Sequence, residues 1–383
     1  MFTSRKTIVM LALAVLTVLV CMEPAWADRL TDAINAAPKG AEAGQINLEA
    51  PTGYLGIPGA PNVNVVLGFA WAVWVGWIFS TVGAFGGIMA GVGHITVFGF
   101  GDYATGFKKT SPALNKVVTD SIRVSNQWLV GTSAGISSYN YYKMGRLVLP
   151  LALSLGLGSI AGSTLVPWLT AGKISLSSYI GYFGLFVLFL GCYLLYETTP
   201  RGQASKKQAK EAAKAFEASI KGESKVDTSA MGVKVKSFSP SKCTFTFYGV
   251  EFSFNPLIPL CGGFLIAAMA SFLGVGGGFL LVPFLTSVAG LPMYLVAGTS
   301  ALAVLIGMVT SIFTYMFVSN TPIFWPLIGA ELVGVFIGSI IGPRTSKYIP
   351  DVWLKRIFIL LAFYVGIRYS AKGLFGLSLL PPY

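Results

Sequence analysis

The sequence predicts an all-α polytopic membrane protein built from two inverted-topology repeats with glycine-broken helical hairpins. Three observations predict this fold class. Only 11% of the 383 residues are charged, 54% are hydrophobic, and the mean hydropathy is +0.70. Soluble domains carry about 25% charged residues, so most of this chain cannot face water. Long uncharged intervals alternate with short basic clusters, and glycine-rich motifs recur in the same order in two parts of the chain.

The charge pattern and the cysteines exclude several classes of protein. The formal net charge of +12 lies in short clusters between apolar runs, which indicates membrane topology rather than a nucleic-acid partner. No metal site is predicted, and no cofactor motif is present. The four cysteines lack CxxC spacing and therefore suggest no disulfide framework; they are Cys21, Cys192, Cys243 and Cys261.

Residues 1–27 have the pattern of a secretory signal peptide. Arg5 and Lys6 precede the uncharged stretch Thr7–Met22, and Ala25-Trp26-Ala27 forms an A-x-A cleavage site. We expect cleavage after Ala27, with retention of the segment as a membrane anchor as the alternative. In both cases the polar segment 28–62 is extracytoplasmic.

The remaining chain divides into a first membrane repeat at 63–196, a linker at 197–254 and a second membrane repeat at 255–383. A bilayer is crossed by about 20 apolar residues. The uncharged segments Val63–Phe100 and Asn255–Ala289 are too long for one crossing, and glycines interrupt both. We expect each to enter the membrane and return as a hairpin, followed by three crossings.

The positive-inside rule assigns the sides of the membrane. The linker holds ten Lys and Arg residues against six acids, so we expect it in the cytoplasm of a bacterial cell, with the protein in the inner membrane. Lys143, Arg146 and the basic cluster Arg344–Arg356 then also lie inside. The first repeat begins outside and the second inside, which is the inverted plan of many secondary transporters.

Three short motifs support a duplication. Each occurs once before and once after the linker, and the order is the same. They pair Ser80–Gly87 with Ser271–Gly278, Gly131–Ala134 with Gly298–Ala301, and Gly158–Gly162 with Gly338–Gly342. An insertion centred on Lys108–Arg123 accounts for the longer spacing in the first repeat.

The second repeat resembles a known family. The run Gly274–Leu285 reads GVGGGFLLVPFL and is followed by Ala297-Gly298-Thr299-Ser300. It is similar to the repeat signature of the sulfite exporter TauE/SafE family, and the resemblance covers about Val66–Phe375. The resemblance implies a polytopic permease with two related halves, acting on sulfite, sulfonates or similar sulfur-containing anions.

The paired motifs predict an anion site. Helices broken by glycine expose backbone N–H groups and positive helix ends, and hydroxyl groups add donors without a fixed charge. For Gly158–Gly162 and Gly334–Gly338–Gly342 we expect close helix packing, which small-xxx-small spacing usually indicates, and packing is the alternative for Gly274–Gly278. The candidate substrate-binding residues are Gly83, Gly86, Gly87, Thr132, Ser133, Gly274, Gly276, Gly277, Gly278, Thr299 and Ser300.

Two ionisable residues are candidates for ion coupling. Glu331 is the only acid between Glu251 and Asp351, and His94 is the only histidine in the chain. An ionisable group within a membrane span is costly and therefore indicates a function. A structural position near the outer interface is the alternative for Glu331, and a hydrogen-bonded structural role is the alternative for His94.

The motif Gly131–Gly135 fits the G-x-S-x-G pattern of serine hydrolases. We reject an enzyme, because the pattern requires a strand–turn–helix setting and His94 is the only base available.

The linker has its own predicted structure. Ser205–Glu223 predicts a solvated helix with i,i+4 pairs Lys207–Glu211 and Glu217–Lys221. Lys242–Phe254 predicts a hairpin about Gly249. The linker offers a docking surface for a cytoplasmic partner, with a merely solvated charge run as the alternative.

The leading function is therefore a membrane permease for a small anion, working by alternating access. The alternative is a non-transporting membrane subunit that docks a redox or signalling complex through the linker. The expected partners are the anion and the lipid bilayer, and nothing in the sequence specifies an oligomeric state.

Overall fold

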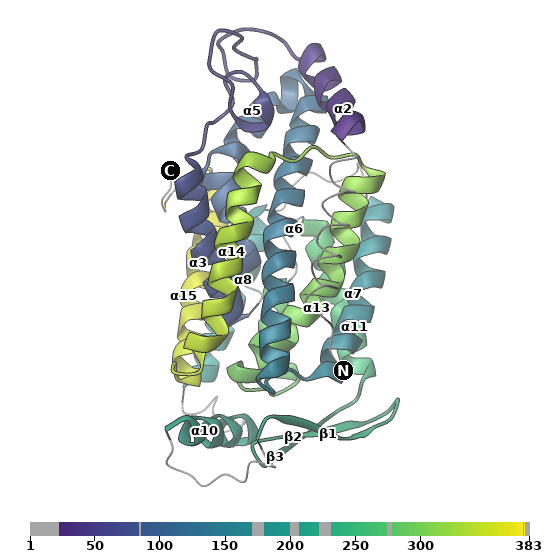
Figure 1. The fold of residues 1–383 in the computed structure, drawn as a ribbon, viewed down its shortest axis with the longest axis vertical. Helices are drawn as coiled ribbons and strands as arrows, with labels where there is room; N and C mark the ends of the chain where they lie inside the picture. Colours follow the sequence, from purple (N-terminus) through teal and green to yellow (C-terminus); the bar gives the residue numbers. More distant parts are fainter. Residues whose placement is uncertain are drawn as a thin grey trace, which may run out of the picture.

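The computed structural model describes residues 23–83, 86–170, 180–199, 207–221, 231–273 and 278–379 apart from 378. It is a tall bundle of helices with a small sheet at one end (Figure 1). Four of the described helices are long and apolar enough to cross a membrane, and shorter apolar helices lie among them. The predicted class, an all-α polytopic membrane protein, is confirmed.

The first half contains one broken segment followed by three long helices. Asn64 begins it, because its side chain accepts a hydrogen bond from the Val66 N–H at 2.8 Å and so caps the first helix. The elements are α3 (Val65–Val82), α4 (Gly86–Val92), η2 (Gly93–Val97), α5 (Phe100–Thr110), α6 (Pro112–Lys143), α7 (Leu149–Thr170) and α8 (Ile180–Thr198).

The second half repeats this order without a counterpart of α5. Its elements are α11 (Leu257–Leu273), α12 (Gly278–Pro283), η5 (Phe284–Val288), α13 (Met293–Phe313), η6 (Thr314–Val318), α14 (Trp325–Ser346), α15 (Asp351–Ser370) and η7 (Ala371–Phe375). The segments η2 and η5 are both π-helical turns, and they stand at the same sequence separation after Gly87 and Gly278.

The first glycine break forms the predicted helical hairpin. Gly83 has φ +93°, a backbone conformation that favours glycine, and it ends α3. The helix α4 then returns along α3, since the Trp71 indole N–H donates to the Met89 carbonyl at 3.2 Å and a Cβ on Gly93 would overlap Trp71. The expected hairpin over Val63–Phe100 is therefore confirmed.

In the second half, as in the first, an aromatic ring on one arm packs against a glycine on the other arm, but the arms that carry the ring and the glycine are exchanged. A Cβ on Gly262 of α11 would meet the Phe284 ring at 2.5 Å. Gly262 corresponds to Trp71 and Phe284 to Gly93 in the motif alignment. A large ring therefore fills the space beside a glycine in both hairpins, from opposite arms. The break itself, with Gly274, Gly276 and Gly277, lies outside the described residues.

The two halves pack reciprocally against each other. The helix α3 lies along α14, and α7 lies along α11 (Figure 1). A Cβ on Gly338 would overlap the Val73 carbonyl oxygen, and a Cβ on Gly158 would overlap that of Leu260. The packing interpretation of these small-xxx-small glycines is confirmed, because only a hydrogen lets the backbones approach this closely.

Residues 28–62 and the inserted helix α5 cover one end of the bundle, which we call the outer end. The helix α2 (Glu23–Ala36) lies beside α6 at this end (Figure 1) and runs through the expected cleavage position after Ala27. Ile46, Tyr54 and Phe107 are buried in a separate apolar cluster with the first turns of α6. The insertion and the N-terminal segment therefore form one layer over this end of the bundle.

The linker covers the opposite, inner end. The helix α10 (Lys207–Lys221) lies across it, beside an antiparallel sheet of β1 (Val233–Phe238), β2 (Cys243–Phe247) and β3 (Val250–Phe254) (Figure 1). The expected helix and hairpin are both confirmed. Tyr248 and Gly249 form the turn with positive φ, whereas β1 was not predicted, because its alternating lysines resemble a solvated charge run.

Candidate functional site

The first glycine break lies against the second half of the chain. A Cβ on Gly83 would stand 3.0 Å from the Ser300 Oγ and 3.6 Å from the Ala297 Cα. The structure therefore brings a broken helix of one half onto the Gly-Thr-Ser-Ala motif of the other. Ser300 is fully buried and donates to the Ala297 carbonyl at 3.3 Å.

The other described glycines of the candidate set lie beside side chains. A Cβ on Gly86 would overlap Phe79 of α3, whereas a Cβ on Gly87 would make ordinary contact with Val130 at 3.4 Å. Gly278 is buried at the start of α12. Gly86 is therefore required for the tight return of α4, and Gly87 has room for a methyl group.

The predicted hydroxyl donors already have partners in this conformation. The Ser133 Oγ lies 2.7 Å from the Ser339 Oγ of α14, and the Thr299 Oγ1 accepts from the Val148 N–H at 3.2 Å. Thr132 is half-buried on the same helix as Ser133. Because Thr299 satisfies the backbone at the start of α7, it also holds the two halves together.

A chain of buried polar groups leads from the first break to the inner end, and the sequence did not predict it. The Ser80 Oγ lies 2.7 Å from the Ser137 Oγ, and the Tyr141 hydroxyl donates to the Ser80 carbonyl. Tyr141 lies 3.1 Å from the Ser346 Oγ, which accepts from the Arg146 guanidinium at 3.4 Å. Small polar residues in apolar helices were the only signal available for this chain.

Arg146 differs in burial from Lys143, with which the positive-inside rule groups it. Lys143 is exposed. The structure buries Arg146, leaving only 2% of its surface exposed, in the loop between α6 and α7. Its side chain points into the bundle because carbonyl and hydroxyl acceptors of α13 and α14 in the second half converge there.

The two candidate coupling residues lie together near the outer end. The His94 Nε2 is 2.9 Å and 3.1 Å from the two carboxylate oxygens of Glu331, and the two side chains are 1% and 0% exposed. His94 lies on η2 and Glu331 on α14, so the pair joins the first broken segment to the second half. The carboxylate of Glu331 is fully enclosed by protein close to the outer end, an arrangement that fits both the coupling role and the structural position near the outer interface.

Asn126 of α6 completes this cluster. Its Oδ1 lies within hydrogen-bonding distance of the His94 Nδ1. Both ring nitrogens of His94 thus face oxygen acceptors, an arrangement that a doubly protonated imidazolium satisfies. A neutral ring fits once the Asn126 amide is turned, so the cluster accommodates either protonation state.

The layer formed by residues 28–62 and α5 covers the cluster of His94, Asn126 and Glu331. The Tyr54 ring stacks on Phe100 with centroids 3.9 Å apart, and its hydroxyl shares a hydrogen bond of 2.8 Å with Ser121. Burial raises the pKa of Tyr54 to about 12, so this hydroxyl stays protonated. No pattern in residues 28–62 indicated this role.

The geometry excludes the hydrolase motif as a catalytic site. Ser133 lies in the middle of α6 rather than at a strand–turn–helix elbow. Its hydroxyl faces Ser339, while the His94 ring is bound to Glu331 and Asn126.

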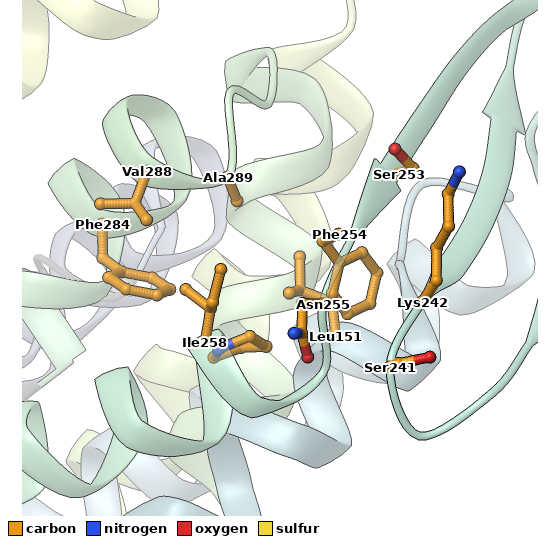
Figure 2. Close-up of a pocket in the computed structure, with 11 residues that line it drawn as sticks. Leu151, Ser241, Lys242, Ser253, Phe254, Asn255, Ile258, Phe284, Val288 and Ala289 are labelled. Carbon is orange, nitrogen blue, oxygen red and sulfur yellow. The ribbon is translucent and has the colours of Figure 1, made fainter.

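A pocket of about 370 Å³ opens at the inner end rather than at the glycine–hydroxyl site. Figure 2 shows Phe284, Val288 and Ile258 on its apolar side, with Lys242 and Asn255 on the side of the sheet. It separates the β-hairpin from the ends of α7 and α11. None of the described candidate substrate-binding residues lines this pocket.

Comparisons with known proteins agree with the fold. The sequence profile of the family described as sulfite exporter TauE/SafE matches residues 67–369. A probable membrane transporter protein of Methanocaldococcus jannaschii is 32% identical over 117 residues, which are 28% of this chain and 43% of that relative. The match thus spans less than half of the relative's length. No solved structure matches the chain.

The family profile covers both halves, both hairpins and the residues that join them, from α3 to α15. The family consists of membrane transporters rather than enzymes. On this evidence the chain belongs to the sulfite exporter TauE/SafE family.

Proposed function

We propose that this protein carries a small sulfur-containing anion, such as sulfite or a sulfonate, across the inner membrane by alternating access. The reciprocal packing of the two halves is the observation that carries the proposal. The helix α3 of the first half lies along α14 of the second, and α11 of the second lies along α7 of the first. Each broken hairpin is thus held by the opposite half, and alternating access in transporters with inverted repeats moves one repeat or bundle against the other around a site at their interface.

Inverted repeats are part of this proposal. The matching breaks, the matching π-helical turns and the exchanged Trp71–Gly93 and Gly262–Phe284 contacts support them. The two halves would then exchange conformations about the contact between Gly83 and Ser300.

The substrate class follows from the family and from the donors present. The glycine breaks offer backbone N–H groups, and Thr132, Ser133, Thr299 and Ser300 offer hydroxyl groups around the junction. An oxoanion would replace the internal hydrogen bonds of these hydroxyls. Because they are neutral, they would bind the anion without retaining it as a fixed charge would.

We further propose that His94 and Glu331 couple transport to a proton. An imidazole and a carboxylate in contact within a dry site can share or release one proton, and Asn126 adapts to either state of the ring. Release of the shared proton would leave a neutral imidazole beside the carboxylate and would weaken the contact between η2 and α14, which joins the two halves.

The transport proposal is tested by flux. Purified full-length protein in liposomes should transport at least one anion from a panel of sulfite, sulfate, thiosulfate and simple sulfonates. A null result across the panel would favour the non-transporting subunit that docks a partner through the linker. A pH jump across the membrane should drive the same flux, and loss of this drive in Glu331→Gln would support the coupling role.

The site assignment has a separate test. Gly277→Val should abolish flux with little change in the melting temperature if the second break opens a binding site. Gly162→Val is the packing control, because a Cβ there would overlap the Phe264 carbonyl oxygen of α11, and it should lower stability. Equal losses of stability and flux in both variants would remove the site assignment.

Sidedness is tested with single cysteines at exposed positions. Thr52→Cys should react only from outside, while Lys207→Cys and Tyr348→Cys should react only from the cytoplasm. External labelling of Tyr348→Cys would contradict the inverted topology.

A further inference from the structure

Arg146 is a buried cation without a carboxylate partner in the described part of the chain. It is 2% exposed and is among the largest fully buried side chains. No described carboxylate oxygen lies within 4.0 Å of it. Its contacts are the carbonyls of Tyr294 at 3.2 Å and Pro343 at 3.4 Å, and the Ser346 Oγ at 3.4 Å. Charge-assisted hydrogen bonds are usually about 2.7–2.9 Å long, so the guanidinium is only loosely bound.

Aromatic rings supply the rest of its surroundings. The guanidinium carbon lies 4.7 Å from the Tyr141 ring centroid, 5.1 Å from that of Phe216 and 5.3 Å from that of Tyr294. Ring faces stabilise a cation without neutralising it. Burial also lowers the pKa of Arg146, since desolvation of its charge outweighs the other influences. A guanidinium in this state gains from an incoming anion, which supplies the missing countercharge and bidentate acceptors.

Arg146 adjoins the proposed transport site. A Cβ on Gly298 would stand 2.6 Å from the Arg146 carbonyl oxygen, and Val148 donates its N–H to Thr299. The polar chain through Tyr141 and Ser346 connects Arg146 with Ser80, just before the first break. An anion that moved from the junction toward the inner end along this chain of polar groups would meet this guanidinium.

The linker helix α10 closes this position from the inner side. Phe216 is 3% exposed and lies over both Arg146 and the Tyr294 ring, 4.4 Å between ring centroids. Glu217 accepts hydrogen bonds from the Tyr294 hydroxyl at 2.9 Å and from the Asp351 N–H at 3.1 Å. The expected helical pair of Glu217 with Lys221 is thus replaced by contacts with α13 and with the start of α15.

The interface between α10 and the helix bundle is not fully packed. A cavity of about 170 Å³ lies between α10 and the start of α15, lined by Ala213, Glu217 and Val352 among others. Glu217 therefore makes the polar contacts that hold α10 in place beside a cavity. Displacing α10 would break these two hydrogen bonds and remove the Phe216 ring from Arg146.

We propose that Arg146 is an anion-binding residue at the inner end of the transport path, and that α10 covers it through Phe216 and Glu217. The ligand class is the oxoanion of the proposed function, on which this inference rests. Binding at Arg146 and docking of α10 compete, so weakening the cover should raise the apparent affinity for the anion.

The test is thermal melting of purified full-length protein with increasing sodium sulfite, against sodium chloride at equal ionic strength. Sulfite should raise the melting temperature of the wild type. Arg146→Gln should raise the half-maximal sulfite concentration about tenfold or more, and Arg146→Lys should fall between the two. Glu217→Ala should lower that concentration several-fold, whereas Glu211→Ala, an exposed acid on the same helix, should leave it unchanged.

The outcomes separate the two proposals. A wild-type sulfite shift that persists unchanged in Arg146→Gln overturns the role of Arg146 and leaves the transport proposal standing. Where Arg146→Gln does not fold, Glu217→Ala decides, and an unchanged or higher half-maximal concentration in that variant overturns the inference. Absence of both a sulfite shift and sulfite flux in the wild type overturns the transport of sulfite, and the inference with it.

Discussion

The outer and inner ends of the bundle occupy corresponding places in the two halves but carry different chemistry. At the outer end, His94, Asn126 and Glu331 form a buried polar cluster. Their counterparts at the inner end, counted from the matching glycine motifs, are Leu285, Met293 and Leu151, which are all buried and apolar. Leu151 also lines the pocket in Figure 2.

This difference between the two ends indicates that the two halves share backbone features but not buried polar groups. The π-helical turns and the contacts between a ring and a glycine recur in both halves of the described chain, and the glycine motifs of the breaks recur in the sequence. The polar cluster occurs once, at the outer end, and the buried guanidinium of Arg146 occurs at the inner end. With the proposed inverted repeats, different groups at the two ends would let the protein couple and bind at separate places.

The largest expected effect on stability comes from replacing a polar residue of the outer cluster with leucine, the residue found at the corresponding place in the inner end. Glu331→Leu should lower the free energy of unfolding by about 3–5 kcal/mol, because it leaves the buried His94 without its charged partner. The double variant His94→Leu, Glu331→Leu should recover much of this loss, since two apolar residues replace the pair. Chemical denaturation of both variants measures the effect, and equal losses in both would contradict a coupled pair.

The next prediction compares the two reciprocal helix interfaces. Gly338→Ala on α14 and Gly158→Ala on α7 should each cost about 1–3 kcal/mol, because the added methyl overlaps a backbone carbonyl oxygen of the facing helix. Gly329→Ala on α14 is the matched control, since its Cβ would meet nothing within 4 Å. Similar losses of stability at both interfaces would support reciprocal packing of the two halves. No loss of stability in Gly158→Ala would contradict it.

A smaller effect should distinguish the two hydroxyl motifs. Thr299→Val removes the acceptor of the buried Val148 N–H and should cost about 1–3 kcal/mol of stability. Thr132→Val alters the corresponding, half-buried position and should cost less. Melting curves and sulfite affinity should be measured for both variants, and an equal stability loss would show that the junction is more symmetric than these contacts indicate.

The smallest effect concerns an ion pair at the inner end. Lys236 lies 2.6 Å from Glu251 on the exposed sheet, and it holds the pKa of that carboxyl below its usual value. This contribution to stability is present above about pH 4.5 and is lost as the pH falls through the lowered pKa. Because Glu251→Gln has no carboxyl to protonate, its melting temperature should fall slightly less than that of the wild type as the pH is lowered below about 4.5. A large effect would contradict the contrast between this exposed pair and the buried pair of His94 and Glu331.

The sequence by itself determined the class of protein and its local features. Few charges and long apolar intervals require a membrane protein, because such surfaces cannot be hydrated. Gly83 could be predicted as a helix break, since glycine alone tolerates its positive φ. The hairpin about Gly249 and the helix of the linker likewise follow from short-range pattern.

Only the tertiary structure decided which residues meet. His94 and Glu331 are separated by 237 positions, and no local periodicity connects them. Arg146 has the sequence context of a surface charge, yet its acceptors lie 148 to 200 positions further on. These contacts exist because reciprocal packing of the two halves brings distant helices together, so the chemistry of both ends depends on packing rather than on any segment alone.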